Sequence, residues 1–272
     1  MRPRAFSLLL LLAGLVFSTP ARAFDYTITD MAQGISRHKA TWIMPFTWSD
    51  AYHSEHSEVV FQFSLKKQIM NTGFHVAYTQ KSFWQAYNEH ESSPFRETNY
   101  NPEIFYRFLP GSPLHRMLGN GSLVNKMGAD LGFEHESNGQ DMPDSRSWNR
   151  FYVTPFYADG NLLAWLKLWY ITEDSKDVST NDSKGSNNPD IADFMGYSEF
   201  NIKYQFIGEQ LIHLMARGNL REGKGAASLT WSIPVTEGGV FFMVQGFHGY
   251  GDSLIDYNRE ITRVGAGFML CR

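Results

Sequence analysis

The chain has 272 residues, with 24 basic and 28 acidic side chains and a formal net charge of −4. This mild acidity argues against nucleic acid as a partner, and no apolar run after the amino-terminal segment reaches the ~18 residues of a spanning helix, which excludes a helical membrane protein. The single cysteine, Cys271, leaves no intramolecular disulfide. Many short alternating segments with 23 glycines and 15% aromatic residues favour an all-β fold.

Residues 1–23 have the pattern of a secretory signal peptide. Two arginines precede a short apolar core at residues 6–17, and a small-x-small cleavage site ends at Ala23. Cleavage there would remove three arginines and no acidic residue, leaving 21 basic against 28 acidic side chains and a net charge of −7. We expect residues 24–272 to form a single domain.

Apolar and polar side chains alternate along twelve segments, as strands do in a barrel wall between lipid and a polar interior. In residues 197–206, for example, Phe200 and Tyr204 oppose Asn201 and Lys203. Most segments reach the ~9–11 residues that cross a bilayer when tilted, and an even number lets both chain ends lie on the periplasmic side. The sequence therefore predicts a twelve-stranded antiparallel transmembrane β-barrel. Its strands are expected at residues 41–48, 58–66, 72–80, 100–108, 127–135, 149–158, 162–171, 197–206, 210–218, 226–233, 239–246 and 260–269.

Aromatic and charged side chains fit the environments of such a barrel. Aromatic residues near segment ends predict interface girdles, with Trp42, Trp48, Trp84, Trp148, Trp169, Tyr170 and Tyr197 as examples. Charges of both signs on the inner faces favour a paired network that fills a narrow lumen over an ion pathway; they are Glu103, Arg107, Lys167, Glu199, Lys203, Arg217 and Arg263. A soluble β-sandwich or lipocalin-like barrel also alternates, but it would bury apolar side chains where these charges lie. The polar segment 173–195 is expected to be a long loop that faces outward.

The segment around residues 127–150 carries a candidate catalytic site. As a strand it places His135 and Ser137 on the same apolar outer face as Leu131 and Phe133, with the two Cα atoms about 6.5–7 Å apart. Asn149 opens the next strand, and a hairpin would bring it beside His135. Nucleophilic serine chemistry needs such a base and such an orienting group. Polar groups facing hydrocarbon cost a few kcal/mol, which favours a functional reason for them, although a passive barrel with incidental polar residues stays open.

The loop between these strands offers two further groups. The backbone N–H of Gly139 can approach an oxyanion, and the oxygens of Ser145, Asp141 and Asp144 suit a hard cation such as calcium. The histidines of the chain show no spacing typical of a zinc site.

The run from Glu134 to Gly139, followed by the run from Ser145 to Arg150, resembles the signature of bacterial outer-membrane phospholipase A. The resemblance covers most of the chain from about residue 58 onward. Other stretches that resemble this family are residues 77–85, 92–100, 188–191 and 249–258.

This resemblance implies a twelve-stranded barrel in the bacterial outer membrane, with its active site toward the outer leaflet. It implies that Ser137 is the nucleophile, His135 the general base and Asn149 the orienting residue, and that Gly139 donates to the oxyanion. The implied reaction is calcium-dependent hydrolysis of the sn-1 and sn-2 acyl esters of glycerophospholipids and lysophospholipids. A deacylase acting on lipopolysaccharide would use similar chemistry.

The resemblance also implies that activation requires a homodimer with Ca²⁺ at its interface. The ligands would be the Ser145 hydroxyl, the Gln140 carbonyl and Ser92 of the partner subunit. Tyr78 and Gln80 match family positions near the active site and the dimer interface.

Two positions depart from the family pattern. Met142 stands where the family can carry an aspartate that helps to bind calcium, so Asp141 or Asp144 would substitute for it or calcium would bind more weakly. The chain also ends in Leu270-Cys271-Arg272 and not in an aromatic residue, which puts the usual assembly signal in doubt.

Overall fold

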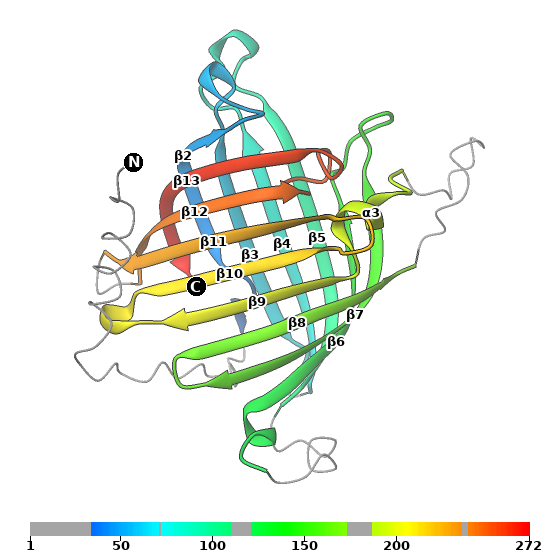
Figure 1. Ribbon diagram of the computed structural model, residues 1–272, viewed down its shortest axis with the longest axis vertical. Coiled ribbons are helices and arrows are strands. Elements are labelled where there is room, and N and C mark those ends of the chain that lie inside the picture. The colour runs from blue at the N-terminus through cyan, green and yellow to red at the C-terminus, as the bar shows by residue number, and fades with distance from the viewer. Residues whose placement is uncertain (1–33, 71, 110–120, 173–186, 236–238) are drawn as a thin grey trace, which may run out of the picture.

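The computed structural model describes residues 34–70, 72–109, 121–172, 187–235 and 239–272. The expected signal peptide and most of the segment 173–195 lie outside these ranges. Within them, thirteen strands form one antiparallel sheet that closes into a barrel (Figure 1). They are β1 (Ile35–Arg37), β2 (Thr41–Ser49), β3 (Val59–Gln68), β4 (Phe74–Trp84), β5 (Phe95–Phe108), β6 (Met127–Ser137), β7 (Ser147–Asp159), β8 (Leu162–Ile171), β9 (Ser198–Gln205), β10 (Leu211–Asn219), β11 (Lys224–Pro234), β12 (Phe241–Tyr250) and β13 (Glu260–Cys271).

Twelve of these strands form the closed ring. Each of β3 to β13 pairs with its sequence neighbours, and β2 closes the ring by pairing with both β3 and β13. The short β1 is additional: it pairs Ile35 with Lys67 on β3, whereas β2 pairs Trp42 with Gln62 on the same strand. The predicted twelve-stranded antiparallel barrel is therefore confirmed. The strand β1 pairs with β3 beyond the residues of β3 that pair with β2.

The two faces of the wall follow the predicted alternation. Leu131 and Phe151 are 54% and 57% exposed on the outside, while their neighbours Asp130 and Arg150 are buried in the barrel. Apolar residues therefore cover the outer surface, and polar side chains occupy the interior. No helix in the described ranges is long and apolar enough to cross a membrane.

The predicted aromatic girdle is wrong at three positions. Trp42, Trp148 and Trp169 are at most 7% exposed and face the interior. For Trp148 the reason is the two-residue period: Asn149 next to it points outward, so the indole points inward and donates from Nε1 to Glu136 at 2.9 Å. Other aromatic residues of the expected girdle are exposed, namely Trp48, Tyr170 and Tyr197.

The predicted network of paired charges is present in the lumen, except that Lys203 forms no ion pair with any residue of the described ranges. Arg107 forms an ion pair with Asp130 at 2.7 Å, and Lys39 lies 3.2 Å from Glu103. Pairing of this kind offsets the desolvation cost of buried charge. The network does not fill the lumen, however, because a cavity of about 920 Å³ lies between these side chains.

One end of the barrel is closed by two connections that fold into its mouth. The short helix α3 (Ile191–Met195) and the β12–β13 loop (residues 251–259) lie at this end (Figure 1). Their side chains pack against indoles of the wall. The buried apolar cluster here includes Ile191, Met195, Leu254, Tyr257, Trp148 and Trp169. The β6–β7 loop lies at this same end. The packed side chains in the mouth of the barrel therefore lie behind the candidate site.

Charged contacts pin the β12–β13 loop to the wall. Asp252 accepts from Arg263 at 2.7 Å and from Lys81 at 3.2 Å. Burial alone would raise the pKa of the Asp252 carboxyl, but Lys81 and Arg263 hold that pKa well below its ordinary range.

Candidate active site

The β6–β7 hairpin brings the candidate residues together by its register. His135 lies opposite Asn149, and Ser137 lies opposite Ser147. Pairing runs without a shift over eleven positions, from Met127 to Ser137. Since side chains at paired positions share a face, the register decides which groups on the outer wall can meet.

On the outer face the His135 and Asn149 side chains are in contact. His135 Nδ1 lies 2.8 Å from Asn149 Oδ1, the distance of a hydrogen bond in which the ring N–H donates to the amide oxygen. Ser137 lies two residues along the strand on the same face, and all three side chains are half-buried. Among the described residues, no hydrogen bond joins the Ser137 hydroxyl to His135. The structure thus brings together two of the three predicted residues and leaves the third beside them.

Polar groups on β4 and β5 extend this outer surface. Gln80 pairs with Tyr100, which in turn pairs with Ser137, so the three form a row across neighbouring strands. The Tyr78 hydroxyl donates to Gln80 Oε1 at 3.0 Å. Tyr78 and Gln80 therefore lie near the candidate site, as the resemblance implied.

The inner face of the hairpin holds the register with buried charge. Glu136 Oε2 accepts from Arg150 Nη2 at 2.8 Å as well as from the Trp148 indole. Arg150 also forms an ion pair with Glu134, at 3.1 Å, and its guanidinium lies 3.6 Å from the centre of the Trp148 ring. Asn101 donates to the backbone carbonyl of His135 at 2.9 Å. These residues lie directly behind His135 and Asn149 and restrict how the outer side chains can move.

The inner-face residues were not predicted as part of the site. The acidic residues Glu134 and Glu136 flank His135 in the sequence. Because side chains alternate along a strand, this pattern could have indicated that the two carboxylates face the interior behind His135. The partners Asn101 and Trp148 have no such signal, because their contacts depend on the strand register.

The loop after Ser137 has a defined shape. Gly139 has a φ of +65°, a conformation that favours glycine, and a Cβ there would lie 3.2 Å from the Tyr100 ring. The side chain of Asn138 accepts from the backbone N–H of Arg146 at 2.9 Å and donates to the Asp144 carbonyl at 2.8 Å. Asn138, the first residue of the loop, thus forms hydrogen bonds with residues at the other end of the loop.

The loop offers oxygen atoms that fit calcium in kind but not in number. Ser145 is half-buried, and its hydroxyl accepts from the Asn187 side chain at 2.8 Å. The carboxylates of Asp141 and Asp144 are exposed on one turn, whereas Met142, 69% exposed, carries a thioether that hard cations bind poorly. Calcium takes about 6–8 oxygen ligands, some of which can be water, and the loop oxygens of one chain would supply part of such a set.

Ser92 lies on a different connection of the same barrel end. It follows the β4–β5 turn Glu89–Glu91 and is exposed. Across the described ranges, no hydrogen bond joins it to Ser145 or Gln140, and no group of three or more His, Cys, Asp or Glu side chains is placed to hold a metal. Within one chain, Ser92 is therefore not joined to the other two expected calcium ligands.

The arrangement suits transfer of an acyl group to a serine hydroxyl, from a substrate that lies in an apolar phase. A hydroxyl, an imidazole oriented by an amide and a nearby glycine N–H are the groups that such chemistry uses. They stand on the outer wall among exposed apolar side chains, including Leu131, Phe151 and Val153. A substrate with long apolar chains can therefore reach them along the wall without entering the lumen.

Known proteins resemble the chain over most of its length. The family model described as Phospholipase A1 matches residues 25–270, a longer match than the resemblance noted from residue 58 onward. Phospholipase A1 of Escherichia coli strain K12 is 38% identical over 234 residues, which cover 84% of this chain and 74% of the relative. The structure of the Salmonella typhi outer membrane phospholipase dimer with bound calcium is 34% identical, with a TM-score of 0.72 over 88% of this chain and 93% of that chain. An asparagine-to-alanine active-site mutant of Escherichia coli outer membrane phospholipase A is 32% identical, with a TM-score of 0.71 over 92% of this chain and 94% of that chain.

Proposed function

The chain belongs to the phospholipase A1 family, and from this premise we propose that it hydrolyses the sn-1 and sn-2 acyl esters of glycerophospholipids and lysophospholipids with Ser137 as the nucleophile. Its family and its closed barrel identify it as a phospholipase integral to the outer membrane. The observation that carries the proposal is the contact of 2.8 Å between His135 Nδ1 and Asn149 Oδ1, on the same outer face as Ser137.

In the first half-reaction Ser137 Oγ attacks the carbonyl carbon of the ester. His135 takes the serine proton at Nε2, because Nδ1 donates to Asn149, and this bond fixes the tautomer and stabilises the ring as it becomes charged. The N–H of Gly139 donates to the oxyanion. Collapse of the tetrahedral intermediate expels the glycerol oxygen, which takes the proton from His135 and leaves an acyl-serine.

In the second half-reaction water attacks the acyl-serine. His135 accepts a proton from the water and returns it to Ser137 Oγ as the fatty acid leaves. An amide at position 149 offers the imidazolium less charge stabilisation than a carboxylate would. An asparagine in the active site is supported by the relative whose active-site asparagine was replaced, and the contact between His135 and Asn149 supports the orienting role.

Calcium is proposed as the cofactor, held by the Ser145 hydroxyl, the Gln140 carbonyl and Ser92 of the partner subunit. When bound, it would supply positive charge that stabilises the developing oxyanion. The proposal is supported by the all-oxygen donor set of the loop and by the calcium bound to the Salmonella typhi relative.

A homodimer is proposed as the active form. Two outer walls that meet would enclose the acyl chains between them and bring Ser92 of the partner subunit to the loop. The incomplete oxygen set of one chain and the dimeric state of the relative support this assembly. Crosslinking and activity should then rise together when calcium is added, and full activity of a strictly monomeric preparation would contradict it.

The active site is proposed to face the outer leaflet. The β6–β7 loop lies at the end of the barrel opposite the carboxyl terminus of β13, since the chain enters β13 at the mouth and leaves it at the other end. In outer-membrane barrels the shorter turns lie on the periplasmic side and the longer loops outside.

The direct test replaces the nucleophile. Ser137→Ala should lose hydrolysis of mixed phospholipid and detergent micelles by at least about 10³-fold, because the hydroxyl that forms the acyl bond is gone. Heat-modifiable migration on a gel should stay unchanged, which shows that the barrel is intact. Ser147→Ala is the matched control: it removes the hydroxyl opposite Ser137 and should retain most activity. Hydrolysis that persists in Ser137→Ala would exclude Ser137 as the nucleophile. If calcium also has no effect on hydrolysis, the proposed calcium-dependent mechanism is excluded as well.

A further inference from the structure

Asn138, the residue after the nucleophile, binds both ends of the loop that follows. It is 3% exposed. Its Oδ1 accepts from the N–H groups of Gln140 and Arg146 at 3.3 and 2.9 Å, and its Nδ2 donates to the Asp144 carbonyl at 2.8 Å. The conformation that sets the Gly139 N–H and the Gln140 and Ser145 oxygens therefore depends on which way this one carboxamide points.

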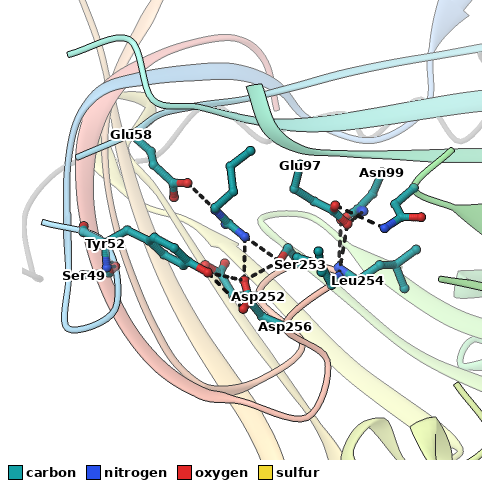
Figure 2. A network of polar contacts seen from close by, with 12 residues as sticks. Ser49, Tyr52, Glu58, Glu97, Asn99, Asp252, Ser253, Leu254 and Asp256 are labelled. Atoms are coloured by element: carbon teal, nitrogen blue, oxygen red, sulfur yellow. Dashed lines mark hydrogen bonds and ion pairs between the residues drawn. The ribbon is translucent and has the colours of Figure 1, made fainter. Parts of the chain in front are cut away.

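Glu97 on β5 holds that carboxamide from inside the barrel. Its side chain is fully buried, and Oε2 accepts from Asn138 Nδ2 at 3.3 Å. The other oxygen accepts from Asn99 Nδ2 at 2.5 Å and from the Ile255 N–H at 3.1 Å (Figure 2). In the described part of the chain no lysine or arginine forms an ion pair with Glu97. A buried carboxylate is thus held by three neutral donors, and one of these is the side chain that shapes the loop.

The opposite side of Glu97 is a firm support. Asn99 Oδ1 accepts from the N–H of Leu254 at 3.1 Å (Figure 2), and Leu254 belongs to the buried apolar cluster at the mouth of the barrel. The contacts therefore run from the packed mouth of the barrel through Glu97 to Asn138. A group tied to a rigid support on one side can fix a mobile group on the other.

We propose that Glu97 is a positioning residue for ester hydrolysis, acting through Asn138 to hold the loop of residues 139–146 in its productive conformation. This inference rests on the proposed function, since it assigns Glu97 to the reaction at Ser137. The acceptor character of both carboxylate oxygens is the property that matters. A glutamine at position 97 would replace one of these oxygens by an amide donor. In one orientation that donor would face the amide donor of Asn138, and in the other orientation the contacts with Asn99 and Ile255 would be lost.

The test compares Glu97→Gln with Asp256→Asn. Both changes neutralise a buried acid of the same barrel end, but Asp256 does not touch Asn138. Two quantities are measured on heat-modifiable protein in detergent: the rate at which a fluorophosphonate labels Ser137 at saturating calcium, and the calcium concentration that gives half-maximal hydrolysis. We expect Glu97→Gln to lower the labelling rate and raise the calcium requirement, each by about 10-fold to 100-fold. Asp256→Asn should stay within about twofold of the wild type in both.

A second variant approaches the same contact from the loop side. Asn138→Asp sets a carboxylate oxygen against Glu97 and should show the same two defects, so it carries the test if Glu97→Gln yields no folded barrel. Combining Glu97→Gln with Asn138→Asp restores a donor and acceptor pair at the same total charge and should recover part of the labelling rate.

Two results would overturn the positioning role: wild-type behaviour of Glu97→Gln, or equal losses in Asp256→Asn, which would reduce the role to general support of the barrel mouth. Failure of the wild-type protein to label at Ser137 is a different result, because it removes the proposed function itself.

Discussion

The two faces of the β6–β7 hairpin carry different polar groups: an imidazole, an amide and a hydroxyl on the outer face, and charged side chains on the inner face. On the outer face His135 is held to Asn149 by one hydrogen bond, among exposed apolar side chains. On the inner face Glu136 and Arg150 form several charged contacts and are shielded by the Trp148 ring. Within the described ranges, the ion pairs nearest the proposed catalytic groups are thus on the inner face of the hairpin.

This difference follows from the two-residue period of a strand. Residues 134 to 138 alternate between the faces: Glu134, Glu136 and Asn138 are the inward members, and His135 and Ser137 the outward ones. Each proposed catalytic side chain is therefore next in sequence to a residue that faces inward. The hairpin can keep polar groups in an apolar setting because its other face fixes the backbone that carries them.

The inner face should dominate stability. Arg150→Met leaves the buried Glu134 and the half-buried Glu136 with fewer cations, so we expect the free energy of unfolding to fall by about 3–5 kcal/mol. Denaturant unfolding in detergent, followed by tryptophan fluorescence, measures this. Arg221→Met, at an exposed turn, is the control and should change stability by less than about 0.5 kcal/mol. Equal effects of the two variants would remove the distinction between the faces.

The outer face should dominate activity. Asn149→Ala removes the acceptor of the His135 N–H and should lower kcat/KM by about 10-fold to 100-fold with little change in unfolding. Asn149→Asp keeps an acceptor there and should recover most of the loss. Hydrolysis of a soluble ester by both variants, at saturating calcium, provides the measurement. An alanine variant as active as the wild type would show that the contact with Asn149 is not used.

The smallest expected effect concerns the loop, which belongs to neither face. Met142→Asp adds a carboxylate to a turn that already exposes Asp141 and Asp144. We expect the calcium concentration for half-maximal activity to fall by about 10-fold, because a hard anionic oxygen replaces a thioether. Met142→Asn adds a neutral oxygen and should have a smaller effect. No change with either variant would place position 142 outside the calcium site.

The barrel was predictable because lipid on one side and a polar lumen on the other impose the same alternation on every strand. All twelve predicted segments overlap strands of the ring. The strand β1 was missed, since three residues are too few to show a period. The prediction for Trp42, Trp148 and Trp169 is wrong because a position near a strand end does not specify which face of the wall a side chain occupies.

The site was predictable only where its residues are close in sequence. His135 and Asn149 are fourteen residues apart, and a hairpin joins them directly. Glu97 on β5 and Asn138, which directly follows β6, are 41 residues apart, and no local pattern specifies the register of these two strands. Inward anchors of this kind become visible only when the barrel closes.

The central claim is that Ser137 reacts from the outer wall with the help of His135. It is tested most directly by a fluorophosphonate with a long alkyl chain, added to the protein in liposomes with calcium, and by mass spectrometry of the resulting peptides. The account predicts one adduct, on Ser137, in the wild-type protein and its loss in His135→Ala with the barrel intact. An adduct on another residue, or equal labelling of Ser137 without His135, would contradict it.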